Sequence, residues 1–318
     1  MNIIAMTRQS LIVAALILST AVAYSQQVEQ DSVKTADTKK AEGEEAKDEK
    51  EGLRERQRKQ WTKYYTQQIK KYTFNFESDD KSSLKLSPDS KLHYLNSVRG
   101  LETHGEMFIW TENGKCVLAG SILSYDFGPG QRRVAHEFHS FSEKKITGGR
   151  NKFPVELPKH GVTFKEITGA PKVSKSRALR MVQLRQLAKS FEASTLAAKG
   201  VDRPLRALNQ PIFRYDTKDI EDDGAVFAYV TGTDPELLVA IETRQTKDGP
   251  KWHFAAARFT DLPITLKYKK QSVWEFNEQS SYEGGYSCTH GIDFQPSMPE
   301  VEEEPSNSKS KNSAGANK

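Results

Sequence analysis

The feature that most constrains the fold is an internal match between two stretches of the chain. The segment GEMFIW (residues 105–110) recurs as GAVFAY (224–229), with Gly and Phe at the same places and Trp replaced by Tyr. The offset is 119 residues, and at that offset Tyr94 also matches Phe213. A pattern that recurs at one spacing indicates a repeated structural unit.

A second match follows in the same order. The segment HEFHSFSEKKIT (136–147) aligns without gaps to FAAARFTDLPIT (254–265) at an offset of 118. One residue of slippage in the intervening hairpin accounts for the change of offset. Two windows in order at nearly one offset favour duplication over chance, so we predict two related units.

Each copy shows a helical pattern followed by strand patterns. Apolar residues recur at helical spacing from Trp61 to Tyr72 and again from Met181 to Phe191. Alternating segments bounded by turn residues follow, and ENGK (112–115) is typical of a two-residue hairpin. The predicted class is α+β, with two tandem units that each consist of a helix and an antiparallel β-meander of about four strands.

The two ends of the chain have compositions that do not build a core. Arg8 precedes a short apolar run that ends in small residues up to Ala23, which is typical of an export signal; an uncleaved anchor is the alternative. Both the stretch after it and the last twenty residues are charged and polar, which favours disorder. The predicted boundaries are a signal peptide at 1–23, a disordered charged linker at 24–52, a first repeat at 53–147, a basic connection at 148–174, a second repeat at 175–277, a C-terminal extension at 278–298 and a disordered tail at 299–318. We predict an exported mature chain, periplasmic or secreted, without a transmembrane segment.

The stretch HEFH at residues 136–139 could be taken for a metal or acid–base site. Side chains alternate along a strand, so His136 and His139 point to opposite faces and cannot chelate one ion. The spacing also differs from the HExxH pattern of zinc-binding helices. Glu137 and His139 do share a face, so an acid–base pair in a polar pocket of the first unit is an alternative hypothesis. We predict no metal site and no cofactor.

Cys116 and Cys288 are the two cysteines of the chain. In an oxidising compartment they could pair, and closing so long a loop stabilises by about 5 kcal/mol in the chain-entropy model. The alternative is two thiols, since Cys288 lies close to the predicted tail.

Positive charge is concentrated around the connection between the two copies. From Lys144 to Arg185 there are eleven Lys or Arg and two acidic residues. Such a strip attracts anionic polymers through counterion release, although a solvated linker is the alternative. Few aromatic residues interrupt it, which argues against base stacking and nucleic-acid specificity. The predicted binding residues are Lys144, Lys145, Arg150, Lys152, Lys159, Lys165, Lys172, Lys175, Arg177 and Arg180.

Residues 223–261 resemble a family of secreted bacterial proteins. The positions that carry the resemblance are Gly224, Phe227, the GTDPE stretch at 232–236, Trp252 and Arg258. The resemblance implies export and supports the hairpin assignment, and it implies no activity. We therefore predict an exported, non-catalytic binding or structural protein of the cell envelope whose basic strip contacts an anionic polymer or polysaccharide. The alternative is an enzyme or small-molecule binder that uses Glu137 and His139.

Overall fold

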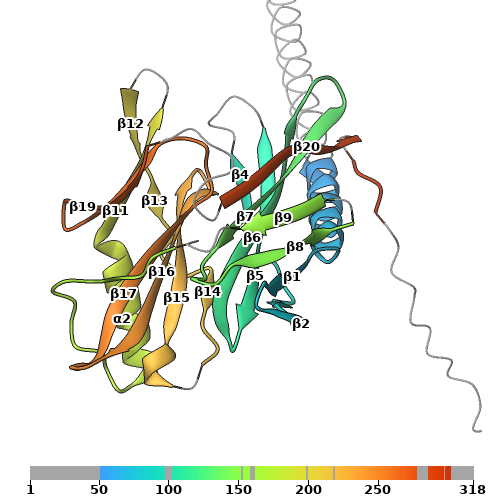
Figure 1. Cartoon of the computed structure of the whole chain (residues 1–318). Helices are drawn as coiled ribbons and strands as arrows, with labels where there is room; N and C mark the ends of the chain where they lie inside the picture. Colours follow the sequence, from blue (N-terminus) through green and yellow to red (C-terminus); the bar gives the residue numbers. More distant parts are fainter. Residues whose placement is uncertain are drawn as a thin grey trace, which may run out of the picture. The chain divides into compact units, whose positions relative to one another are not determined.

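The computed structural model describes residues 51–96, 102–151, 153–157, 162–197, 200–217, 219–277, 286–296 and 298–301 (Figure 1). The predicted signal peptide, residues 24–50 of the predicted linker and residues 302–318 of the predicted tail lie outside the described residues. The chain divides into two units, Met1–Lys59 and Gln60–Lys318. Residues 51–59 of the first unit are helical. The second unit begins with helical residues 60–69 and contains all the strands given below.

The second unit is mostly β, and the predicted α+β class of helix-plus-meander units is wrong. Strands account for 53% of the structure. Beside the N-terminal helix, the described residues contain the α-helix α2 (Arg177–Lys189) and the short 3-10 helix η2 (Ile220–Asp222). The prediction allowed about four strands for each unit, whereas the structure has two four-stranded and two six-stranded sheets. One helical pattern also runs into a strand. Phe191, assigned to the helical face, is the first residue of a strand, because an apolar residue at a boundary fits a period of 2 as well as one of 3.6.

The second unit has two halves, and each half contains two sheets. The first half is formed by the earlier strands together with the C-terminal strand. One of its sheets has four strands in the order β2-β1-β8-β9, and the other has β20-β7-β6-β5-β3, with β4 also paired to β5. The strands of the four-stranded sheet are β1 (Thr73–Phe76), β2 (Asp79–Ser83), β8 (Ile146–Arg150) and β9 (Phe153–Leu157). The strands of the six-stranded sheet are β3 (Lys85–Leu86), β4 (Leu92–Asn96), β5 (Thr103–Glu112), β6 (Lys115–Asp126), β7 (Gln131–Ser140) and β20 (Tyr286–Pro296).

The second half has the same two kinds of sheet. The four-stranded sheet has the order β12-β11-β18-β19, and the six-stranded sheet has β10-β17-β16-β15-β13, with β14 also paired to β15. The strands of the first are β11 (Phe191–Ala197), β12 (Val201–Pro204), β18 (Ile264–Tyr268) and β19 (Gln271–Phe276). The strands of the second are β10 (Lys165–Glu166), β13 (Arg206–Ala207), β14 (Phe213–Arg214), β15 (Gly224–Thr231), β16 (Asp234–Thr246) and β17 (Gly249–Arg258).

One edge strand of each six-stranded sheet lies far along the sequence from the strand with which it pairs. In the second half, β10 from the basic connection pairs with β17 at two positions. In the first half, β20 pairs with β7 from Tyr286 to Pro296, with one irregularity in register. The C-terminal segment, which we expected to follow the second repeat as an extension, therefore completes a sheet of the first half (Figure 1).

The hairpins follow from turn chemistry. Asn113 and Gly114 both have positive φ, at 50° and 79°, which is the conformation of a tight two-residue turn. This turn joins β5 and β6, whose end residues Glu112 and Lys115 face each other, so the predicted hairpin is confirmed. A second two-residue turn joins β16 to β17, with Thr246 opposite Gly249.

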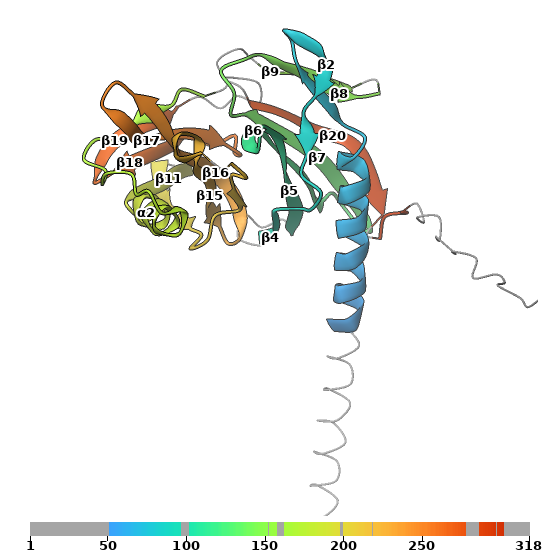
Figure 2. The ribbon, with the colours of Figure 1, turned by 90° about the horizontal axis from the view of Figure 1, so that it is seen from below.

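Alternation along the strands sorts the apolar side chains into three cores. One core joins helical residues 60–69 to one face of the β5-β6-β7 meander, and another joins α2 to one face of the β15-β16-β17 meander (Figure 2). The third contains Met107 and Ala119 from the first meander together with Val226 and Ala240 from the second. The two six-stranded sheets therefore pack face to face and share a core.

Candidate functional site

Glu137 and His139, the predicted acid–base pair, lie in the interior. Both are on β7 and are buried, with 9% and 3% of their surface exposed. The ring of His139 lies beside Phe141 and Phe259 of the shared core, at centroid distances of 6.3 and 6.4 Å. Its Nδ1 donates to the carbonyl of Ser140 over 3.0 Å. A substrate would have to part the two sheets to reach this pair, so its position favours a structural role.

The two cysteines are not joined. Both are buried thiols, and the sulfur of Cys288 lies 3.7 Å from Oε1 of Glu137. In the sheet register Cys288 faces Glu137 of β7, and Glu137 faces Ser121 of β6, five residues along β6 from Cys116. With strands about 4.8 Å apart and about 3.3 Å per residue, their Cα atoms lie well beyond the roughly 7 Å that a disulfide can span.

Two of the predicted binding residues are buried and hold the fold together. Arg150 donates to Oε1 of Gln68, and its guanidinium lies 5.6 Å from the ring centre of Tyr72. Arg180 reaches from α2 to Asp223, with Nε 2.5 Å from Oδ2. These two arginines have 7% and 4% of their surface exposed, so neither can offer its charge to a polymer.

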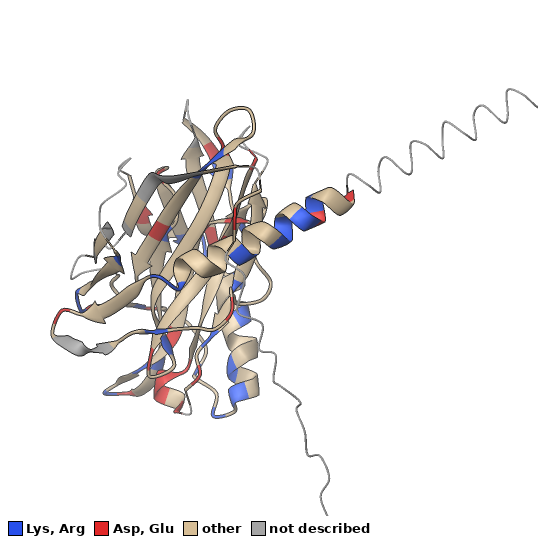
Figure 3. Ribbon diagram, turned by 90° about the vertical axis from the view of Figure 1, so that its right-hand side faces the viewer, with Lys and Arg blue, Asp and Glu red and all other residues tan. Residues whose placement is uncertain are grey.

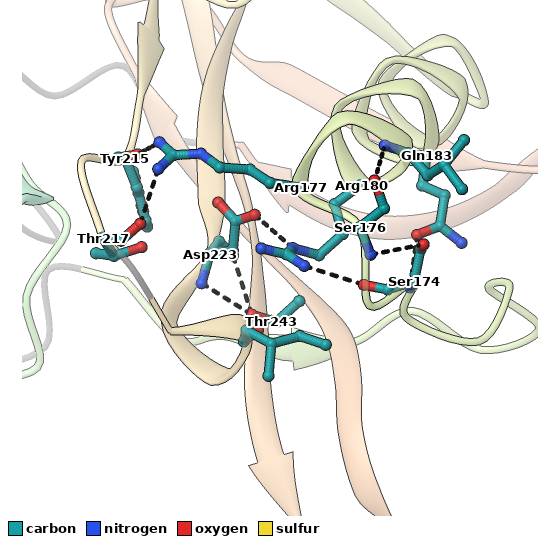
Figure 4. A network of polar contacts seen from close by, with 12 residues as sticks. Ser174, Ser176, Arg177, Arg180, Gln183, Tyr215, Thr217, Asp223 and Thr243 are labelled. Atoms are coloured by element: carbon teal, nitrogen blue, oxygen red, sulfur yellow. Dashed lines mark hydrogen bonds and ion pairs between the residues drawn. The ribbon is translucent and has the colours of Figure 1, made fainter.

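Arg180 belongs to a polar network that fastens the start of α2 to the sheet (Figure 4). Its Nη1 donates to the carbonyls of Ser174 and Lys175, just before the helix. Arg177, also predicted to bind ligand, donates instead to the carbonyls of Tyr215 and Thr217. The hydroxyl of Ser176 accepts from the amide of Leu179 and caps the helix N-terminus. The sequence shows these two arginines as part of a run of charge because their partners on the sheet side, Tyr215, Thr217 and Asp223, lie 38 or more residues away.

Three more members of the strip have partners in the fold. Lys145 pairs with Glu77 at 2.7 Å, and Lys144 lies 3.9 Å from Glu112. Nζ of Lys165 donates to the carbonyl of Val273 over 2.9 Å. Lys152 and Lys159 lie outside the described residues. The strip is thus not one continuous binding surface, and Figure 3 shows Lys and Arg spread along the ribbon among Asp and Glu.

The remaining members, Lys172 and Lys175, are exposed and lie in the loop between β10 and α2. Within the described part of the chain, neither ammonium group makes a hydrogen bond or an ion pair. This loop forms one wall of an open pocket of about 370 Å³, which we call the Trp252 pocket. Its lining residues are Glu166, Ile167, Gly169, Ala170, Pro171, Lys172, Val173, Asp248, Pro250, Lys251 and Trp252.

Charged groups surround the Trp252 pocket from three segments. Lys251 of β17 lies 3.2 Å from Glu166 and 3.7 Å from Asp248. The hydrogen bond and charge of Glu166 raise the pKa of Lys251 above its usual value. From the turn after β18, Lys269 Nζ donates to the carbonyl of Gly169 over 3.4 Å. Two lysines, Lys172 and Lys251, and two carboxylates, Glu166 and Asp248, line the pocket, and Lys269 adds a third ammonium group at its wall.

Several residues of this site are not among the predicted binding residues. Lys251, Asp248 and Lys269 lie outside the basic strip and reach the pocket only through the hairpin tip of β16-β17 and the turn of β18-β19. In the sequence, Trp252 stands out only as one of the positions that carry the resemblance of residues 223–261 to secreted bacterial proteins. A signal was present in TKDGPK, a turn that carries three charges at its tip. Charge at a hairpin tip is common on surfaces, so it does not by itself indicate a site.

The described residues contain no group of three or more His, Cys, Asp or Glu side chains that could hold a metal ion. His136 lies on the face of β7 opposite to His139, and its Nδ1 is 2.8 Å from the hydroxyl of Tyr72. Among the described helices, none is long and apolar enough to cross a membrane.

No family model, no curated protein and no solved structure matches the chain. The resemblance of residues 223–261 to secreted bacterial proteins is therefore not supported by a matching family model.

Proposed function

We propose that the protein is a non-catalytic binding protein exported to the cell envelope, and that the surface around the Trp252 pocket contacts an anionic polymer. The observation that carries the proposal is that Lys172 and Lys251 line one open pocket, that Lys269 contacts its wall at Gly169, and that Lys175 lies exposed in the loop that forms one side of it. Long-range attraction and counterion release make such a cluster favourable for polyanions.

The contacts of individual residues restrict the proposed binding residues to a part of the basic strip. Lys172 and Lys175 are the members whose charge is both exposed and without an ion-pair partner in the described residues. Arg150 and Arg180 are excluded by burial. Binding should therefore depend on Lys172 and Lys175, and not on the total number of basic residues between 144 and 185.

The test is retention of the purified protein on immobilised heparin, a sulfated polysaccharide, during a salt gradient. The variant Lys172→Glu/Lys175→Glu should elute at clearly lower salt than the wild type. A matched control is Lys70→Glu/Lys85→Glu, which changes the net charge equally at two exposed lysines of the other half. If both variants shift equally, retention reflects net charge alone and the proposal fails.

A further inference from the structure

We propose that the Trp252 pocket holds one acidic sugar residue of the polymer, a hexuronate, so that the lysines outside the pocket position the chain and the pocket selects its sugar. This inference rests on the proposed function. The pocket volume of about 370 Å³ falls in the range of small-molecule sites, roughly 300–1,000 Å³, and exceeds what a simple anion needs.

The floor and the rim of the pocket differ in chemistry. Ile167, Val173 and Trp252 are buried side chains that contribute apolar surface to the lining, and Pro171 and Pro250 add exposed or half-buried rigid edges. The rim carries Glu166, Lys172, Asp248 and Lys251. A pyranose ring has the same division, with C–H groups on its face and polar groups around its edge.

The rim offers both acceptors and donors. Among the described residues, Glu166 and Asp248 share one ion-pair partner, Lys251, and their side chains are 47% and 62% exposed. Ionised carboxylates accept hydrogen bonds from hydroxyl groups, and ammonium groups donate to carboxylates. Lys172 has no ion-pair partner among the described residues and can meet the acid group of the sugar. A ligand with several hydroxyls and one carboxylate uses all four side chains, whereas an inorganic phosphate would be repelled by the two carboxylates.

The aromatic side chain argues against a nucleic-acid ligand. Base stacking requires an open ring face, and Trp252 has 1% of its surface exposed. Its Nε1 has no hydrogen-bond partner among the described residues, although buried donors are rarely left in that state. Trp252 therefore acts as part of the wall, and its indole N–H is a local reporter of what enters the pocket.

The experiment is NMR of the full protein with labelled tryptophan, in which the Trp252 indole signal is assigned by its loss in Trp252→Phe. Titration with a short glucuronate oligomer should shift this signal. Glucose oligomers and inorganic phosphate at equal concentration should leave it in place. The variant Glu166→Gln/Asp248→Asn should bind the glucuronate oligomer at least about tenfold more weakly, since hydrogen bonds to charged groups are worth roughly 1.5–3 kcal/mol. Glu192→Gln, at an exposed carboxylate of β11, is the matched control.

The outcomes separate this inference from the proposed function. If heparin retention depends on Lys172 and Lys175 but glucuronate does not move the Trp252 signal, the pocket is not the sugar site and the polymer-binding proposal stands. If neutral sugar or phosphate shifts the signal as much as glucuronate does, the acidic-sugar assignment is overturned. If glucuronate shifts it while heparin retention ignores the two lysines, the proposed polymer contact fails and the pocket binds a small acid.

Discussion

At the scale of single residues, the most unusual groups are three histidines held as neutral bases, of which His136 and His139 are buried and His104 is half-buried. Desolvation lowers the pKa of His104, His136 and His139 from 6.5 to about 3 in each case. Nearby arginines add to the effect: Arg132 for His104, Arg150 for His136 and Arg258 for His139. Two of the imidazoles meet tyrosine hydroxyls, since His104 contacts Tyr65 and His136 contacts Tyr72, both over 2.8 Å.

These histidines should make the protein sensitive to mild acid. In the unfolded chain each takes up a proton below about pH 6.5, while the folded chain resists protonation until about pH 3. The stability that comes from keeping them neutral is complete above pH 6.5 and is lost as the pH falls toward 3. Each histidine contributes about 1.4 kcal/mol per pH unit in that window. Urea unfolding between pH 7.5 and 4.5 should show a steep fall in the free energy of unfolding.

The variant His136→Gln tests the cause. It should reduce the slope of stability against pH by about one histidine's share, whatever packing it loses at pH 7.5. An unchanged slope in this variant would mean that acid sensitivity arises elsewhere in the molecule.

The packing of two tyrosines against glycines also corrects the alignment of the two copies of the repeat. The ring of Tyr94 lies so close to Gly105 that a Cβ there would come within 2.5 Å of it. In the second half Tyr215 lies against Gly224 in the same way, at 2.7 Å. Tyr215, and not Phe213, therefore corresponds to Tyr94. A single offset misplaces this tyrosine because the segment between the tyrosine and the glycine is two residues shorter in the second half, 9 positions from Tyr215 to Gly224 against 11 from Tyr94 to Gly105.

At the scale of elements, α2 is attached by a buried ion pair. Asp223, just before β15, is fully buried and lies within 2.5 Å of both Arg180 and Arg214. The hydroxyl of Thr243 accepts from the Asp223 amide over 3.0 Å. Exposed ion pairs contribute little, but removing one partner of a buried pair leaves an uncompensated charge.

Arg180→Met should lower the free energy of unfolding by about 3 kcal/mol, the low end of the usual range because Arg214 still faces the carboxylate. The double variant Arg180→Met/Asp223→Asn should lose less than the sum of the two single losses, since each single change removes the other's partner. Lys189→Met, at the exposed end of α2, is the control and should be nearly neutral. Equilibrium urea unfolding measures all four proteins, and strict additivity would contradict the pairing.

The outer strand β20 shows how an element far along the chain can complete an early sheet. Without it, β7 would present its unpaired backbone groups at a sheet edge, an arrangement that favours association with other chains. Pairing with β20 covers β7 from Gln131 to His139. In the second half β10 covers only two residues of β17, and the Trp252 pocket lies where the chain leaves that strand.

At the scale of the whole molecule, the shared core joins the two halves of the second unit. Residues from both six-stranded sheets contribute to it, so separating the sheets would expose Met107, Ile109, Leu238 and Ala240 to water together. Two hairpin turns, β5-β6 and β15-β16, also bond to the other half: the amide of Asp216 donates to the carbonyl of Gly114, and the amide of Thr233 donates to that of Leu95.

The two halves should therefore unfold together. Trp61 and Trp110 lie in the first half, and Trp252 and Trp274 lie in the second. Trp61→Phe/Trp110→Phe and Trp252→Phe/Trp274→Phe each leave fluorescence in one half. In either variant the fluorescence midpoint in urea should coincide with the circular dichroism midpoint of the same protein. Two separate transitions in one variant would show that the halves are independent.

The sequence by itself determined the local features of this protein. The matched segments 105–110 and 224–229 lie in β5 and β15, the matched segments 136–147 and 254–265 begin in β7 and β17, and the hairpin at Asn113-Gly114 has the predicted turn. These depend on alternation and on turn residues, which are properties of neighbours in the chain. The incompatibility of His136 and His139 with one metal ion followed from the same alternation.

Only the tertiary structure decided the class, the partners and the site. The two four-stranded sheets pair strands more than 60 residues apart, and β20 pairs with β7 about 150 residues away. Arg150 and Arg180 were predicted to be exposed binding residues, but they are buried beside Gln68 and Asp223. Lysines from three segments meet at the Trp252 pocket for the same reason. Burial and charge pairing depend on contacts between distant residues, and a local period in the sequence carries no information about which distant segments meet.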